Sequence, residues 1–500
     1  MRKKVLATAV VALAGMFTSL PAGAVTAGQG APGVGDPYYP DYGNGGYDVA
    51  HYDLRLKYQP ADDHLEGTAT ITATATQDLT RFNLDFALTV SEVLVNNRKA
   101  TFARSGAHEL EITPALPLRR NQPVTVVVRY AGTPSQVTVN GINPWLRTPD
   151  GGVAAGEPEG SWWWFPSNDH PSDKATYDVS VLVPDGTQAI SNGTLQSAVS
   201  RLGWTRYNWR SSKPQATYLT TLAVGRFEIV TDTTESGLPV FSAYSRDLGA
   251  DEGAAKASVG RAAEILDWET GVFGPYPFDA IGGYVPNVPT GYALETQTRP
   301  FYSPRHFRSG ANPYVVVHEQ AHQWFGDDVS VRTWRDIWLN EGFARYAEWL
   351  WSEKEGEGTA AELAAYTYGF YPADNPFWQV RPGDPGAENQ FHAAVYNRGA
   401  IALQALRGEV GDQTFFKILK GWPVANKYGN ARVEDFVAYA GRLAGRPLDD
   451  LFRTWLFTAG KPASPPVAAN ARSAAPTGPL QEPRSWKKIQ REGLSDHAEH

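Results

Sequence analysis

The 500-residue sequence contains no cysteine, and its only two methionines are Met1 and Met16. The absence of cysteine excludes disulfide bridges, thiolate nucleophiles and thiolate metal ligands. Any metal site must therefore use histidine and carboxylate side chains. A chain of this length can bury a core large enough to fold without cross-links.

Long hydrophobic runs are also lacking. The one mostly apolar run, residues 5–20, is 16 residues long, whereas a helix needs roughly 20 to span a bilayer. It follows three basic residues at positions 2–4 and precedes the small residues 22–24, which is the pattern of a secretory signal. We predict a cleaved signal over residues 1–24 and a secreted protein without a transmembrane anchor.

The chain has no excess of positive charge. It has 45 Lys and Arg against 53 Asp and Glu, a net charge of −8, and loss of the predicted signal would make this −11 because three basic residues leave. Proteins that bind nucleic acids normally present a basic surface. The composition therefore argues against a nucleic-acid partner.

The hydrophobic pattern changes once along the chain. Residues 37–232 alternate apolar and polar side chains between turn signals, which predicts an antiparallel β domain with strands that include 52–56, 68–74, 124–128 and 177–181. Residues 233–465 show mostly helical periodicity, with helices predicted at 254–270, 313–325, 341–354, 393–410, 433–444 and 448–457 and a strand at 281–285.

Two segments outside these domains have little apolar patterning. Residues 25–36 are small and rich in glycine, and we predict a flexible N-terminus there. Residues 466–500 begin with Ala, Pro and Ser and end with mixed charges. Such composition predicts a disordered or weakly docked tail.

The most informative motif lies in the second domain. His318 and His322 are four residues apart, so on a helix they share one face and both imidazoles can reach one point. Together with Glu341 they can form a three-ligand zinc site that keeps a position open for water. Glu319, between the histidines, would act as general base toward that water. Asn312 and Pro313 supply a cap and a first residue for the predicted helix.

With these residues the chain resembles the aminopeptidase N family of gluzincins, in a short form without the C-terminal helical domain. The family pattern is His-Glu-x-x-His, eighteen residues, then Glu, which His318, His322 and Glu341 match. A metzincin would need histidine at position 328, which is Asp328. The resemblance implies a β saddle domain, a thermolysin-like and mainly α catalytic domain, and one zinc ion per chain.

The resemblance also implies substrate-binding residues. Tyr396 matches the tyrosine that stabilises the transition state, and Glu157 matches a glutamate that binds the substrate's amine, although Glu159 competes for that role. A four-residue segment takes the place of the substrate-binding Gly-x-Met-Glu motif and comprises Tyr292, Ala293, Leu294 and Glu295. Glu157 and Glu295 would then clamp a free α-ammonium group by charge-assisted hydrogen bonds.

The predicted function is that of a secreted, monomeric zinc aminopeptidase acting on peptides with a free N-terminus, with Glu319 as the base. Replacement of the family's Gly and Met by Tyr292 and Leu294 leaves a zinc endopeptidase or amidase without strict amine recognition as an alternative. A catalytically silent peptide-binding homologue is the second alternative.

Overall fold

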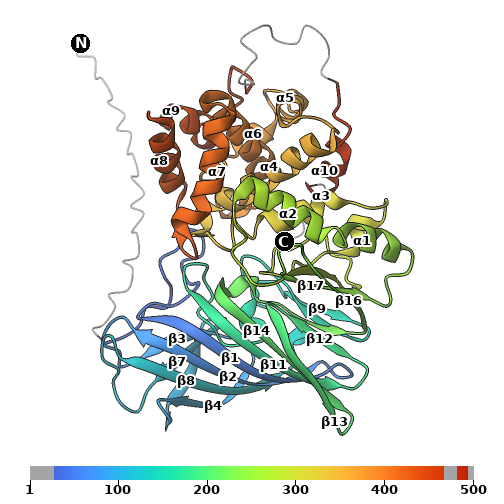
Figure 1. Cartoon of the computed structure of the whole chain (residues 1–500). Coiled ribbons are helices and arrows are strands. Elements are labelled where there is room, and N and C mark those ends of the chain that lie inside the picture. The colour runs from blue at the N-terminus through green and yellow to red at the C-terminus, as the bar shows by residue number, and fades with distance from the viewer. Residues whose placement is uncertain (1–27, 467–480, 494–500) are drawn as a thin grey trace, which may run out of the picture.

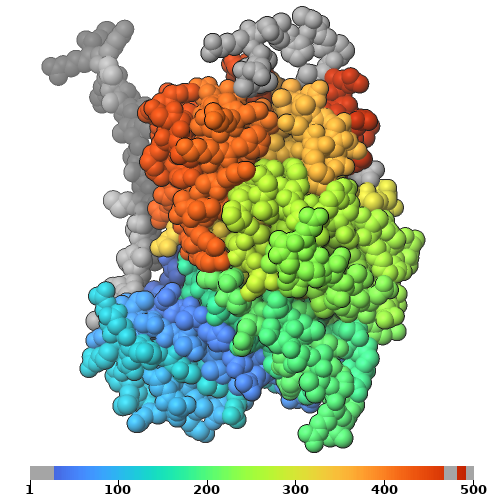
Figure 2. Space-filling view, viewed as in Figure 1, coloured from blue at the N-terminus to red at the C-terminus, as the bar shows by residue number. Residues whose placement is uncertain are grey.

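A computed structural model describes residues 28–466 and 481–493. It shows a sheet-rich N-terminal region followed by a mainly helical region (Figure 1), which confirms the predicted fold class. In the space-filling view the helical region rests directly on the sheets (Figure 2). The predicted signal at 1–24 lies outside the described residues.

The N-terminal region is built on an eight-stranded sheet. Its order is β13 (Thr194–Arg201), β14 (Trp204–Ala216), β11 (Lys174–Pro184), β1 (Tyr47–Gln59), β2 (His64–Ala75), β8 (Pro123–Gly132), β4 (Thr89–Val95) and β5 (Arg98–Lys99). All neighbours are antiparallel except β1 and β11, which run parallel. The prediction of a purely antiparallel domain is wrong at this pair, because a long connection rather than a hairpin joins the two strands.

Smaller sheets complete this region and its junction with the helices. They are β12 (Gln188–Ser191), β15 (Leu222–Gly225), β10 (Gly151–Ala154) and β9 (Trp145–Thr148); β3 (Phe82–Asp85), β7 (Glu109–Thr113) and β6 (Thr101–Ser105); β16 (Phe227–Thr233), β17 (Pro239–Ser245) and β18 (Ile281–Val285); and the pair β19 (Ser330–Val331) and β20 (Asn430–Ala431). β16 crosses the predicted boundary at 232 and pairs with β17, which lies wholly beyond it. The two regions therefore share a sheet.

The helical region surrounds a core rich in tryptophan. Its helices are α1 (Glu252–Val259), α2 (Ala262–Phe273), α3 (Pro313–Ala321), α4 (Trp338–Glu355), α5 (Ala360–Phe370), α6 (Ala393–Val410), α7 (Asp412–Asn426), α8 (Val433–Ala444), α9 (Asp449–Phe452) with a π-helical turn (Arg453–Phe457), and α10 (Trp486–Gly493). Among the described residues, every helix is too short or too polar to cross a bilayer.

Several predicted elements need correction. The helix predicted at 254–270 is two helices, α1 and α2, because the chain leaves helical geometry at Arg261 (φ −84°, ψ 4°), directly after Gly260, and glycine is a poor helix former. α5 was not predicted, although Thr359 and Glu362 form the capping box that begins it. α7 was also missed, since Pro423 lies inside it.

The two terminal segments are more ordered than predicted wherever the structure describes them. Gly30 donates a backbone hydrogen bond to the Arg81 carbonyl, and Asp36 is buried with only 2% of its surface exposed, so residues 28–36 are anchored at these two points although Val34 is exposed. In the predicted tail, α10 buries Trp486 and Ile489 against the helical core. These apolar residues lie among charges, which hides their amphipathic pattern from composition alone.

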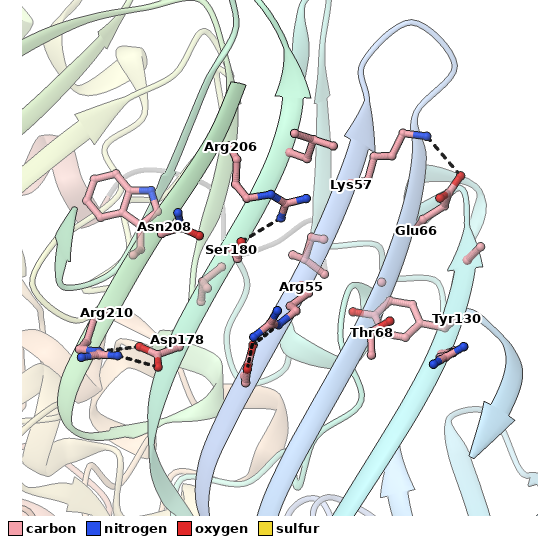
Figure 3. Close-up of a pocket in the computed structure, with 18 of the residues that line it drawn as sticks. Arg55, Lys57, Glu66, Thr68, Tyr130, Asp178, Ser180, Arg206, Asn208 and Arg210 are labelled. Carbon is pink, nitrogen blue, oxygen red and sulfur yellow. Dashed lines mark hydrogen bonds and ion pairs between the residues drawn. The ribbon is translucent and has the colours of Figure 1, made fainter. Parts of the chain in front are cut away.

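A hollow on the outer face of the eight-stranded sheet contains none of the predicted site residues (Figure 3). Most of its charged side chains pair with each other, while Arg206 donates to Ser180 and Arg129 pairs with Glu92. Arg210 contacts Asp178 at 2.7 Å, and Lys57 lies 3.7 Å from Glu66. Because these charges are already satisfied across neighbouring strands, the hollow is read as a solvated sheet face.

Arg299 connects the sheet-rich region to the helical region by hydrogen bonds. Its guanidinium donates to the carbonyl oxygens of Ser191, Gly193 and Phe241 at 3.1, 2.7 and 2.6 Å. It also lies over the Trp209 ring, 5.0 Å from the centroid, and is 1% exposed. A planar group with several fixed donors is needed to reach all three oxygens.

We expect Arg299→Lys to lower the free energy of unfolding by about 2–4 kcal/mol, because lysine leaves buried carbonyl groups unpaired. Urea unfolding followed by tryptophan fluorescence measures this. Arg55→Lys is the control, since Arg55 is exposed and its one ion-pair partner among the described residues is Asp53, and it should cost less than ~0.5 kcal/mol. Equal effects of the two substitutions would contradict the role of Arg299.

Candidate active site

The paired histidines are positioned by a capped helix. The Asn312 side chain accepts a hydrogen bond from the Tyr314 N–H at 3.3 Å, and Pro313 is the first residue of α3, as predicted. His322 directly follows α3 and keeps helical backbone angles (φ −58°, ψ −25°). The rings of His318 and His322 are consequently 4.8 Å apart between centroids.

Close contact between two helices brings the other ligand and the tyrosine to the same place. A Cβ atom on Gly342 of α4 would lie 2.4 Å from the Trp338 side chain, and one on Gly399 of α6 would lie 2.6 Å from it. Glycine at both positions lets α4 and α6 pack against this ring. Glu341 and Tyr396 are thereby brought together, and the Tyr396 ring stacks on His318 at 5.9 Å.

Three ligand atoms converge as a zinc site requires. Glu341 Oε2 lies 3.3 Å from His318 Nε2 and 3.4 Å from His322 Nε2. Ligand bonds of ~2.0–2.1 Å in a tetrahedral zinc site separate ligand atoms by about 3.3–3.4 Å. The donor types and their spacing both fit zinc, and all three residues are buried.

Contacts on the far side of each imidazole fix its orientation. Glu348 Oε1 lies 2.6 Å from His318 Nδ1, and the Phe325 carbonyl oxygen lies 3.1 Å from His322 Nδ1. An acceptor at Nδ1 keeps the proton on that nitrogen, so each Nε2 presents its lone pair toward Glu341. Both side chains are therefore oriented for metal binding.

The site concentrates buried negative charge. Burial raises the pKa of the Glu319 carboxyl to about 8, while the neighbouring His318 and His322 act in the opposite direction. Burial also opposes ionisation of Glu341, but the two histidines outweigh it and hold the pKa of Glu341 below its usual range. Glu319 is thus a buried carboxyl group whose ionisation depends on positive charge beside it, which the two histidines supply in part.

Glu157 and Glu295 both face this cluster. Burial raises the pKa of each side chain, and the charge neighbours of Glu157 include Glu295, Glu341 and His322. One oxygen of each carboxylate, Oε1, is buried without a hydrogen-bond partner among the described residues. These two oxygens can accept hydrogen bonds from a cationic group entering beside the metal ligands.

The competing residue Glu159 has different surroundings. Its carboxylate hydrogen-bonds to Tyr42, and its charge neighbours are Asp169 and Asp41 rather than the histidine cluster. Glu157 and Glu159 are two positions apart in the sequence, yet their carboxylates have different neighbours. Glu159 Oε2 is also buried without a hydrogen-bond partner among the described residues, but only Glu157 has the zinc-site histidine His322 among its charge neighbours.

The rest of the predicted substrate segment has a mainly structural environment. Leu294 is 3% exposed and exchanges two backbone hydrogen bonds with Phe301 at 2.9 and 2.8 Å. Ala293 is partly buried against the helical core. Tyr292 donates its hydroxyl proton to the Ala155 carbonyl at 3.3 Å, which ties this segment to the one that carries Glu157.

Sequence reasoning missed the residues behind His318. Arg345 donates to Glu348 Oε2 at 2.8 Å and to the Ile489 carbonyl at 3.0 Å, so α10 is connected to His318 through two side chains. Glu341, Arg345 and Glu348 lie at i, i+4 and i+7 on α4, a spacing that could have indicated a shared helix face.

We expect Glu348→Gln to weaken zinc binding roughly 10- to 100-fold, because His318 loses the carboxylate that orients it and raises its basicity. Competition with a chromophoric chelator measures zinc affinity directly. Glu357→Gln is the control, since Glu357 pairs with Lys488 and Tyr314 away from the cluster. Equal zinc affinity in both variants would rule out the proposed role of Glu348.

Comparison with known proteins agrees with this geometry. Residues 307–455 match the Peptidase family M1 domain, and residues 49–219 match the Peptidase M1 N-terminal domain. Aminopeptidase M1 of Arabidopsis thaliana is 29% identical over 61% of this chain and 36% of its own length. Aminopeptidase M1-A of Oryza sativa subsp. japonica is 28% identical over 82% of this chain and 50% of its own. The chain thus spans half or less of these relatives.

Solved structures of similar length also match. An M1 zinc metallopeptidase from Deinococcus radiodurans superposes with a TM-score of 0.79 at 32% identity, covering 88% of this chain and 100% of the other. A mutant of an M1 zinc metallopeptidase from Deinococcus radiodurans, bound to a Tyr-Ser-Ala substrate, gives a TM-score of 0.78 at 32% identity, with coverage of 87% and 100%. On these matches, the two-domain fold and the His318, His322 and Glu341 cluster, this chain belongs to peptidase family M1.

Proposed function

We propose that this chain is a zinc aminopeptidase that removes residues from the free N-terminus of peptides. The observation that carries the proposal concerns Glu157 and Glu295 beside the zinc ligands. One buried oxygen of each has no hydrogen-bond partner in the part of the chain that the structure describes. An α-ammonium group would satisfy both oxygens and offset their charge. Binding the amine there would also place the first peptide bond at the zinc site.

Each remaining group has a chemical role in hydrolysis. Zinc held by His318, His322 and Glu341 would supply Lewis acidity, which polarises the scissile carbonyl and makes water more acidic. Glu319 takes a proton from the attacking water and passes it to the departing amine. Tyr396 donates a hydrogen bond to the carbonyl oxygen as negative charge develops on it.

Related proteins support the reaction class. The plant relatives are named aminopeptidases, and one matching structure holds a Tyr-Ser-Ala substrate. A second matching structure, of a two-domain M1 zinc metallopeptidase mutant, holds L-arginine. These aminopeptidases are longer than this chain, so we propose the same reaction for the shorter chain on the basis of its own site residues.

We further propose that the protein is secreted and monomeric. The basic residues at 2–4, the apolar run and the small residues at 22–24 support export with cleavage after Ala24. The intact mass of protein recovered from the culture medium tests this. A secreted chain beginning at Val25 is expected, and retention of a chain beginning at Met1 inside the cell would contradict it.

We expect Glu319→Gln to retain zinc and to lower kcat by roughly 10²–10⁴-fold, because the ligands remain and the base is lost. Metal analysis and turnover of an aminoacyl-nitroanilide, measured on the same preparation, separate the two effects. A variant that keeps zinc and most of its turnover would show that Glu319 is not the base.

We expect wild-type enzyme to cleave aminoacyl-nitroanilides and to leave their N-acetylated counterparts intact, with a chelator abolishing cleavage. Glu157→Gln and Glu295→Gln should each lower kcat/KM on the free-amine set roughly 10- to 100-fold, because a charge-assisted hydrogen bond is lost. Glu159→Gln is the control and should retain activity.

Other outcomes of this panel decide between the alternatives. Equal cleavage of free and blocked substrates would favour an endopeptidase or amidase. Zinc bound in full without any cleavage would favour a peptide-binding homologue. Loss of activity in Glu159→Gln alone would transfer the amine-binding role to that residue.

A further inference from the structure

A second cluster of potential metal ligands lies in the sheet-rich region, apart from the helices that carry the His318 site (Figure 1). It comprises Asp85, His108 and Glu109, whose ligand atoms all lie within 4.8 Å of one another. Asp85 ends β3 and Glu109 begins β7, and the two residues are direct partners across this antiparallel pair. The register of the sheet therefore brings the two carboxylates together.

In each of the two carboxylates, one oxygen accepts hydrogen bonds, and the other accepts none from the described residues. Asp85 Oδ2 accepts from the Asn44 side chain at 3.1 Å and from the Asp169 backbone N–H at 2.7 Å. Glu109 Oε2 accepts from the Asn83 side chain at 2.9 Å. Asp85 Oδ1 and Glu109 Oε1 are buried and accept no hydrogen bond from the described residues.

These two oxygens point toward one imidazole nitrogen. His108 Nε2 lies 3.5 Å from Asp85 Oδ1 and 3.9 Å from Glu109 Oε1. In the metal-free chain His108 Nε2 donates a hydrogen bond to the Asp41 carbonyl oxygen at 3.1 Å, so a metal ion bound at this nitrogen would displace its proton. The side chains of Asp85, His108 and Glu109 are 0%, 2% and 9% exposed, so the group is shielded from solvent.

The cluster has more negative charge than its histidine can offset. Within the described residues, the only ion pairs of Asp85 and Glu109 are those with His108. An imidazolium supplies one positive charge, whereas a divalent cation would neutralise both carboxylates.

The catalytic site offers an internal standard for ligand spacing. There the ligand atoms lie 3.3 and 3.4 Å apart. In the second cluster the corresponding distances are 3.5 and 3.9 Å, with the Asp41 carbonyl oxygen completing a fourth position. One imidazole nitrogen with three oxygens suits Mn²⁺ or Zn²⁺ better than Ca²⁺ or Mg²⁺, which prefer oxygen alone.

We propose that Asp85, His108, Glu109 and the Asp41 carbonyl form a second, structural site for a divalent transition-metal ion. The His108 ring is stacked on Trp162 at 4.1 Å, which closes one side of the group. A metal enclosed in this way has a structural role rather than a catalytic one. The site does not depend on the peptidase activity of the His318 cluster.

Such an ion would stabilise the position of residues 157–169, the segment that begins with Glu157. Asp85 exchanges backbone hydrogen bonds with Ser167 at 2.8 and 3.0 Å, and its carboxylate holds the Asp169 N–H. Trp162, in the same segment, covers His108 and also donates no hydrogen bond from its indole among the described residues. Metal binding at Asp85 would therefore fix residues 157–169 against β3.

The test counts metal ions in a chain whose catalytic site has been disabled. The double variant His318→Ala, His322→Ala is stripped with a chelator, dialysed against Mn²⁺ or Zn²⁺, and analysed by atomic emission. We expect about one ion per chain to remain. Adding His108→Gln should reduce the number of bound ions to none. Glu109→Gln, which retains the shape of the side chain, should do the same when it is added separately.

His170→Gln in the same background is the matched control, because His170 is a buried histidine of the same region that contacts Asp36 at 3.1 Å. It should retain the ion, and circular dichroism verifies that each variant is folded. Addition of Mn²⁺ should also raise the melting temperature of the stripped double variant but not that of the chain carrying Glu109→Gln. A stripped, folded double variant that takes up no ion at micromolar metal would overturn the proposal.

Discussion

The structure depends on bringing buried negative charges together around two imidazoles. Glu319, Glu341, Glu157 and Glu295 all lie close enough to shift one another's ionisation, and burial disfavours the charged form of each. Zinc held by His318, His322 and Glu341 would offset part of this negative charge. In the proposed function, a substrate ammonium group beside Glu157 and Glu295 would offset more of it.

That arrangement requires two regions of the chain to meet with fixed geometry. Glu157 comes from the sheet-rich region and Glu295 from the region that carries the histidines. Arg299 joins these parts through three carbonyl oxygens, and the Tyr292 hydroxyl holds the Ala155 carbonyl. The shared sheet of β16, β17 and β18 adds backbone pairing at the same junction. In the proposed function, recognition of an amine would therefore be a property of the interface rather than of either part.

Polar contacts extend outward from each histidine of the zinc site. His318 is held by Glu348, Glu348 by Arg345, and Arg345 also reaches the carbonyl of Ile489 in α10. The C-terminal helix therefore participates in the environment of a ligand although it lies beyond the matched catalytic domain. The second cluster at Asp85 follows the same design, in which hydrogen bonds to one carboxylate oxygen direct the other toward a common point.

The sequence by itself determined the parts of the protein that depend on local spacing. The pair His318 and His322, the capping residues Asn312 and Pro313, the limits of α6 and α8, and most long strands follow from periodicities that a single helix or strand imposes. Tertiary structure alone decided the features that join distant segments. The parallel pairing of β1 with β11, the choice of Glu157 over Glu159, the link from α10 to His318 and the meeting of Asp85 with Glu109 all depend on how separate elements pack. No local pattern encodes these contacts, because each is fixed by the burial and hydrogen bonding of residues far apart in the chain.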